Sequence, residues 1–123
     1  MSTQDIQTDL SKPDQTVEIT TTGRRTGRLH RIEVRLHNVG GRLFITGNAG
    51  KPRDWYANMR VSAAFTLHLK QNVAADLEAT ATPIVDDAER RSVLRPLLEQ
   101  SGHLDQIEAR LASSPLVRVD VTL

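Results

Sequence analysis

Short stretches of alternating apolar and polar residues recur along this chain, a pattern that is typical of strands buried on one face only. In residues 29–37, for example, Ile32, Val34 and Leu36 fall on one side and charged or polar residues fall on the other. Alternation or β-branched residues mark five further stretches, which we also predict to be strands. These are residues 17–22, 42–46, 64–71, 75–84 and 116–123.

The alternation stops in two places, and the residues there predict helices. Asp54 is expected near the N-cap of a short helix over residues 55–60. Asp86 and Glu89 form a capping-box pattern that opens a helix expected to end near Gly102. A second helix should follow, with these apolar residues on one side: Leu104, Ile107 and Leu111.

This order of elements predicts a mainly β fold with α-helices. About six strands joined by tight turns, with one short inserted helix and a helical stretch before the last strand, are typical of a small split or closed β-barrel. Residues 1–13 are polar and lack a sustained period, so we expect a mobile N-terminal arm, although a helix through Ile6 and Leu10 is weakly indicated. Residues 14–123 should then form a single split-barrel domain.

Composition narrows the possible functions. The formal net charge is +1, so no strong overall field draws the protein to nucleic acid or to membranes. The absence of cysteine excludes disulfide bonds and cysteine-ligated metals, and the four histidines lack the spacing of a metal-ligand pair, so no metal site is predicted. No apolar run is long enough to cross a bilayer and the polar N-terminus does not resemble a signal peptide, so we expect a cytoplasmic protein without a transmembrane segment.

Basic residues gather in a turn that Gly23 and Gly27 bracket, where both glycines permit positive φ. Arg24 and Arg25 lie at its tip, beside the hydroxyl of Thr26. Free backbone N–H groups, a hydroxyl and guanidiniums are suited to an anionic ligand, above all a phosphate. The same pattern also fits a solvated turn whose arginines only favour solubility, and the local sequence does not decide between the two.

A second candidate site follows the third predicted strand. The loop from Gly47 to Lys51 is rich in glycine and leads into the helix that begins near Asp54, so it could form one anion-binding corner with the arginine turn. It could equally be an ordinary connection. Trp55 and Asn58 share a face of that helix, where they either line a ligand pocket or have a purely structural role.

Taken together, these segments resemble a known family. The run Thr-Thr-Thr-Gly-Arg-Arg-Thr-Gly-Arg over residues 20–28, a Gly-Gly turn with a strand, and then Pro-Arg-Asp-Trp-Tyr-Ala-Asn-Met over residues 52–59 resemble the deazaflavin (F-420)-dependent nitroreductase family. That family has the split β-barrel of the flavin-binding, pyridoxamine-phosphate-oxidase-like group. The resemblance covers about residues 17–84, and the last predicted strand is also consistent with it.

The resemblance implies an oxidoreductase that binds coenzyme F-420, with FMN as second choice, and passes hydride to quinones, nitroaromatics or other small electron-poor molecules. It implies no particular catalytic side chain, and it implies a homodimer. The cofactor-binding residues it implies are Arg24, Arg25, Thr26, Gly47, Asn48, Ala49, Gly50, Trp55 and Asn58.

Three departures from the family keep other readings open. Leu29-His30-Arg31 stands where the family often has Pro-Arg-Arg, the glycine loop is short, and Tyr56 is the only tyrosine. A cofactor-free barrel that holds an apolar or lipid-like ligand is therefore an alternative. A nucleic-acid-binding barrel is another, but the arginine-rich strand lacks the interleaved aromatic residues that stack on bases.

Overall fold

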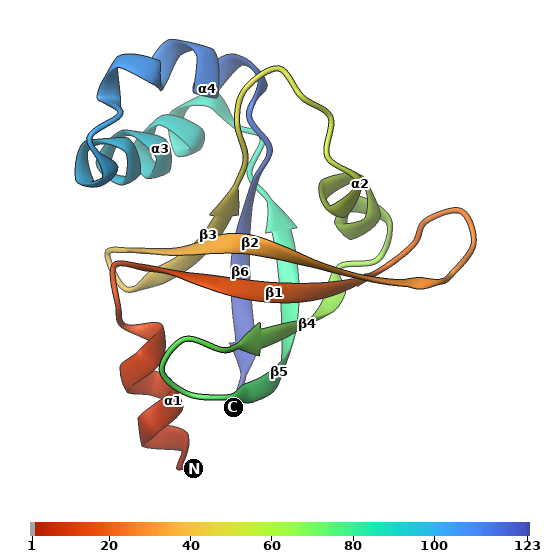
Figure 1. Cartoon of the computed structure of the whole chain (residues 1–123). Coiled ribbons are helices and arrows are strands. Elements are labelled where there is room, and N and C mark those ends of the chain that lie inside the picture. The colour runs from red at the N-terminus through yellow and green to blue at the C-terminus, as the bar shows by residue number, and fades with distance from the viewer. Residues whose placement is uncertain (1) are drawn as a thin grey trace.

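Six antiparallel strands close into a barrel in the computed structural model of this chain, which describes residues 2–123 (Figure 1). They follow one another around the barrel in the order β1-β2-β3-β6-β5-β4, and β4 pairs again with β1. The predicted mainly β barrel is confirmed. The strands are β1 (Asp14–Thr22), β2 (Leu29–Val39), β3 (Arg42–Thr46), β4 (Ala64–Leu69), β5 (Ala75–Pro83) and β6 (Leu116–Thr122).

In the described part of the chain, four α-helices lie outside the barrel: α1 (Thr3–Leu10), α2 (Asp54–Val61), α3 (Asp87–Ser101) and α4 (Ile107–Ser113). A 3₁₀ turn, η1 (Leu104–Gln106), precedes α4. Figure 1 shows α3 and α4 together at one end of the molecule, α1 at the opposite end and α2 beside the long β1–β2 hairpin. Within residues 2–123 no helix has both the length and the apolar character needed to cross a membrane.

Asp54 lies near the N-cap of α2, as predicted. The N-cap residue is Arg53, whose side chain makes no capping hydrogen bond, and Asp54 is the first residue of the helix. The Asp54 carboxylate lies 3.4 Å from Nη2 of Arg24 instead. An acidic residue in the first turn still favours the helix through the partial positive charge of its N-terminus.

The expected mobile arm is instead a helix docked on the barrel, which corrects the description of residues 3–10. A capping box starts α1, because Ser2 Oγ accepts from Asp5 N at 3.1 Å and Asp5 Oδ2 accepts from Ser2 N at 3.2 Å. Leu10 is part of the barrel core, and its carbonyl accepts from Asn38 Nδ2 at 2.9 Å. The single domain over residues 14–123 stays a prediction, and Met1 lies outside the described residues.

The alternating residues fill the barrel as predicted. Ile19 of β1 and Leu67 of β4 are fully buried cross-strand partners. A second apolar cluster lies outside the barrel, where α3 and α4 cover Phe44 of β3. The inward-facing core residues of the strands include Val17, Ile19, Leu36, Ile45, Leu67, Leu77, Ala79, Val117 and Val119.

One half of β2 does not follow the predicted pattern of burial. Leu36 is 2% exposed, but Ile32, on the same face, is 37% exposed. The reason is that β3 pairs with β2 only from Leu36 to Val39, so among the described strands residues 29–35 have β1 alone as a partner. This part of the hairpin extends beyond the barrel and leaves the inner face of β2 open (Figure 1).

Arg90 of α3 ties the end of α4 to the barrel. Its Nη2 donates to the carbonyls of Arg110 at 3.0 Å and Ser114 at 2.7 Å, Nη1 donates to Ile84 O at 3.0 Å, and Nε donates to Leu111 O at 3.3 Å. The residue is only 8% exposed, and within residues 2–123 it has no carboxylate partner. The guanidinium therefore satisfies carbonyls at the negative end of α4.

Candidate functional site

The β1–β2 turn closes on itself and leaves backbone donors free. Gly27 N donates to Gly23 O at 2.9 Å, and Gly23 N donates to Arg28 O at 2.7 Å. Within residues 2–123 the amide groups of Arg25 and Thr26 have no hydrogen-bond partner. Two adjacent N–H groups and nearby guanidiniums form the kind of concave turn that binds anions.

The two bracketing glycines, both of which permit positive φ, adopt different conformations. Gly27 has φ +75°, a conformation that favours glycine, whereas Gly23 does not have positive φ. At Gly23 the constraint is space, because a Cβ there would lie 2.8 Å from Nε2 of His30. A residue with a Cβ at this position would therefore have to displace the ring of His30.

Asn58 of α2 connects the arginine turn to the helix. Its Oδ1 accepts from the backbone N of Arg24 at 3.1 Å and from Nη1 of Arg24 at 2.9 Å. Its Nδ2 donates to Oγ1 of Thr21 at 3.2 Å. Because Asn58 is 3% exposed and Asp54 also contacts Arg24, the turn is held against the first half of α2.

A cavity of about 490 Å³ lies between this hairpin and α2. Its volume is within the range of small-molecule sites. Guanidiniums gather at the exposed turn, while the indole of Trp55 and the side chain of Ile32 provide apolar surface. The indole is 7% exposed and meets the ring of Tyr56 edge to face, with 6.0 Å between the ring centroids. The lining residues are Thr21, Gly23, Arg24, Arg25, Thr26, Arg28, His30, Ile32, Asp54, Trp55 and Asn58.

The structure thus brings together Arg24, Arg25, Thr26, Trp55 and Asn58, five of the residues singled out from the sequence. Sequence reasoning did not assign three further lining residues of β2 and its turn. Strand alternation could have found them, because they share the face that the hairpin turns toward α2. They are Arg28, His30 and Ile32.

The glycine loop does not join this cavity, so the expected single anion-binding corner is not formed. Gly50 N donates to Ser113 Oγ at 2.9 Å and Gly47 N donates to Pro115 O at 3.3 Å, which hold the loop against the α4–β6 junction. Gly50 and the neighbouring Lys51 line a different cavity of about 540 Å³. None of residues 47–50, which include Asn48 and Ala49, lines the hairpin cavity. A cofactor role for these four residues stays a prediction.

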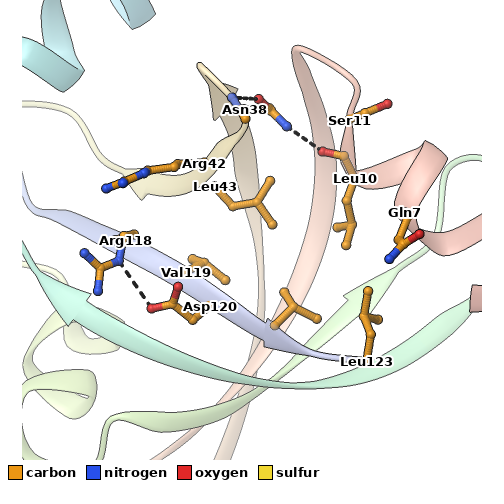
Figure 2. Close-up of a pocket in the computed structure, with 12 residues that line it drawn as sticks. Gln7, Leu10, Ser11, Asn38, Arg42, Leu43, Arg118, Val119, Asp120 and Leu123 are labelled. Atoms are coloured by element: carbon orange, nitrogen blue, oxygen red, sulfur yellow. Dashed lines mark hydrogen bonds and ion pairs between the residues drawn. The ribbon is translucent and has the colours of Figure 1, made fainter.

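A third cavity lies at the end of the barrel near α1. Figure 2 shows Leu10 and Leu43 facing each other across a groove, with Arg42 and Arg118 on the side away from α1. The groove measures about 610 Å³, and Val121 and Leu123 add apolar surface to it. It shares no lining residue with the hairpin cavity. Across the described part of the chain, no group of three or more histidine or acidic side chains is arranged to hold a metal ion.

Solved structures with the same fold share little sequence with this chain. One is a conserved hypothetical protein of Mycobacterium tuberculosis, with 16% identity, a TM-score of 0.71, and coverage of 100% of this chain and 82% of that chain. Another is the heme storage protein HutZ of Vibrio cholerae, with 14% identity, a TM-score of 0.71, and coverage of 98% and 90%. A third is an FAD-binding protein of Mesorhizobium loti, with 12% identity, a TM-score of 0.66, and coverage of 100% and 91%. At these identities the likeness shows the fold alone.

A comparison with curated proteins finds no match. The sequence model of one protein family, described as F420H(2)-dependent quinone reductase, matches residues 2–121. That match includes both the arginine turn and the segment of α2 that carried the resemblance. The chain belongs to the F420H(2)-dependent quinone reductase family.

Proposed function

We propose that this protein is an F-420-dependent oxidoreductase and that the cavity between the β1–β2 hairpin and α2 binds the cofactor. The observation that carries the proposal is the double hydrogen bond from Arg24 to Asn58, which fixes a cationic turn beside a buried indole. A deazaflavin has a flat ring, a phosphate and an acidic tail. The cavity offers apolar surface for the ring, and free N–H groups and guanidiniums for the negative charges.

The arginines of the turn have different tasks in this proposal. Arg24 is already bound to Asn58 and Asp54, so it positions the turn. Arg25 and Arg28 are exposed and, within residues 2–123, form no ion pair, so their guanidiniums are available for the phosphate and the acidic tail. The free amide groups of Arg25 and Thr26 add short-range donors that fix the position of an anion.

The bound deazaflavin, in its reduced form, supplies the hydride for a quinone or another small electron-poor substrate. The protein would orient the cofactor, and the indole of Trp55 would provide apolar surface for its ring. Tyr56 lines the other cavity beside α2, so it is not placed to donate a proton here. We therefore infer that water supplies the proton at the open side of the cavity.

A titration tests the proposal. We expect oxidised F-420 to bind with a dissociation constant of tens of micromolar or lower, measured by the anisotropy of its own fluorescence. Arg25→Gln should weaken binding about tenfold, because a charge-assisted hydrogen bond contributes roughly 1.5 kcal/mol or more. Arg95→Gln, on the exposed face of α3, is the matched control and should leave the affinity unchanged. No binding at these concentrations contradicts the proposal, and saturable binding of FMN instead assigns the site to that flavin.

The groove of Figure 2 favours a second candidate function, the binding of an amphipathic molecule without any cofactor. Leu10, Leu43 and Leu123 provide the apolar surface, and Arg42 with Arg118 can pair with a carboxylate. Native mass spectrometry that finds a copurified fatty acid, together with a failed F-420 titration, would support this function over the reductase.

The nucleic-acid alternative has less support. Phe44, Phe65 and Trp55 are all buried, and Tyr56 is partly buried, so the arginine-rich strand has no exposed aromatic side chain for stacking on bases. A homodimer and a cytoplasmic location stay predictions. The unpaired edge of residues 29–35 supports self-association, which sedimentation velocity would detect.

A further inference from the structure

Three polar side chains form a hydrogen-bonded row on the outer face of the barrel, away from the three cavities described above. They belong to β1, β4 and β5, which are neighbours in the sheet. Thr20 Oγ1 lies 2.7 Å from Nε2 of His68, and Nδ1 of His68 lies 2.6 Å from Oδ1 of Asp76. His68 points outward, since Leu67 and Leu69 on either side of it are in the core, yet it is only 7% exposed.

The carboxylate fixes one proton of this row. A carboxylate can only accept, so Nδ1 of His68 carries a proton and donates it to Asp76. In the neutral imidazole Nε2 is the acceptor, and the hydroxyl of Thr20 donates to it. The hydrogen bond from His68 lowers the pKa of Asp76, which keeps its carboxyl group ionised. A hydroxyl, an imidazole and a carboxylate in this order and at these distances form the arrangement that activates hydroxyl nucleophiles.

The neighbouring strand β2 contributes a cation. Arg31 of β2 is the cross-strand partner of Thr20. Its Nε is 2.5 Å from Oε1 of Glu18, while within residues 2–123 its two terminal nitrogens have no partner. Glu18 is held by Lys70 Nζ at 2.9 Å as well, so Arg31 is anchored at Nε with its remaining donors free. Such donors can stabilise the negative charge that develops on a carbonyl oxygen under attack.

We propose that Thr20 is a nucleophile that accepts a small acyl group from an activated ester. The Oγ1 atom of Thr20 forms a bond to the acyl carbon, and the bond from that carbon to the leaving oxygen breaks. The hydroxyl proton passes to Nε2 of His68 and then to the leaving oxygen, so no oxidant or further reactant is needed. Thr20 lines none of the three cavities described above, so a small acyl group suits this site better than a long one.

The test is acylation by p-nitrophenyl acetate. The reaction is monitored through the release of nitrophenolate, and samples quenched with acid at early times are analysed by peptide mass spectrometry. We expect one acetyl group on Thr20. Thr20→Val keeps the β-branched shape and should abolish this acylation, while Thr20→Ser should retain it. Thr22→Val, two residues along the same face, is the matched control and should react like the wild type.

The imidazole and the carboxylate are tested separately. His68→Gln and Asp76→Asn should each slow the acylation of Thr20 at least tenfold, since a positioned base accelerates such steps by about a hundredfold or more. The Asp76 side chain is 74% exposed, so Asp76→Asn keeps the test decisive even if His68→Gln does not fold. Acetyl groups on lysines alone, or equal rates in the wild type and Thr20→Val, overturn the proposal. The proposal is also overturned if folded Asp76→Asn is acylated at Thr20 as fast as the wild type.

Discussion

Replacing Arg90 by methionine should lower the free energy of unfolding by about 3 to 5 kcal/mol. Methionine fills much of the same volume but offers no donors to the carbonyls of Ile84, Arg110, Leu111 and Ser114. Three of these oxygens lie at the α4–β6 junction and that of Ile84 follows β5, and each buried oxygen left unpaired costs about 1 kcal/mol or more. Urea unfolding followed by far-UV circular dichroism measures the loss.

The neighbouring residue provides the control for Arg90. Arg91 is on the same helix, its side chain is 52% exposed, and its ion pair with Glu108 has a separation of 3.6 Å. Arg91→Met should therefore change the stability by less than about 0.5 kcal/mol. If Arg90→Met costs no more than Arg91→Met, the guanidinium does not hold the junction together.

Replacing Asn58 by alanine should reduce both stability and cofactor affinity. It removes the acceptor of two donors of Arg24 and the donor to Thr21, so we expect a loss of about 1 to 3 kcal/mol in unfolding free energy. The turn is then no longer fixed against α2, and F-420 affinity should fall about tenfold or more even where the protein is fully folded. Denaturant unfolding and the anisotropy titration measure the two effects.

Asn72 provides the matched amide for this comparison. Its Nδ2 donates to Oδ1 of Asp9 at 3.2 Å, near α1, and it does not line the hairpin cavity. Asn72→Ala should lower stability by about 1 kcal/mol and leave F-420 affinity unchanged. If both alanine variants change affinity alike, Asn58 has no special part in forming the cavity.

The sequence predicted the barrel well because alternation records which face of each strand is buried. It predicted β3 at its observed bounds, Arg42–Thr46, and it placed α2 and the two helices before β6. It did not predict that α1 is docked on the barrel, because that helix has only 8 residues and the polar N-terminal segment lacks a sustained apolar period. It also expected Ile32 to be buried, since alternation does not reveal where β3 stops pairing with β2.

The site was predicted only in part, because the contacts that form it join residues far apart in the sequence. The arginine turn and α2 could each be recognised from local composition, but their contact depends on Arg24 and Asn58, which are 34 residues apart. Nothing in the glycine loop indicates that Ser113 and Pro115 hold it elsewhere. Likewise, the contact between Thr20 and His68 depends on the register of β1 with β4, which the alternating pattern does not specify.

Quenching of the single tryptophan tests most directly whether the hairpin and α2 form one cofactor site. We expect F-420 to quench the fluorescence of Trp55 with the same dissociation constant that the cofactor's own anisotropy gives, and Arg25→Gln to shift both curves equally. If the anisotropy saturates while the emission of Trp55 stays unchanged, F-420 binds elsewhere on the molecule and the proposed site is wrong.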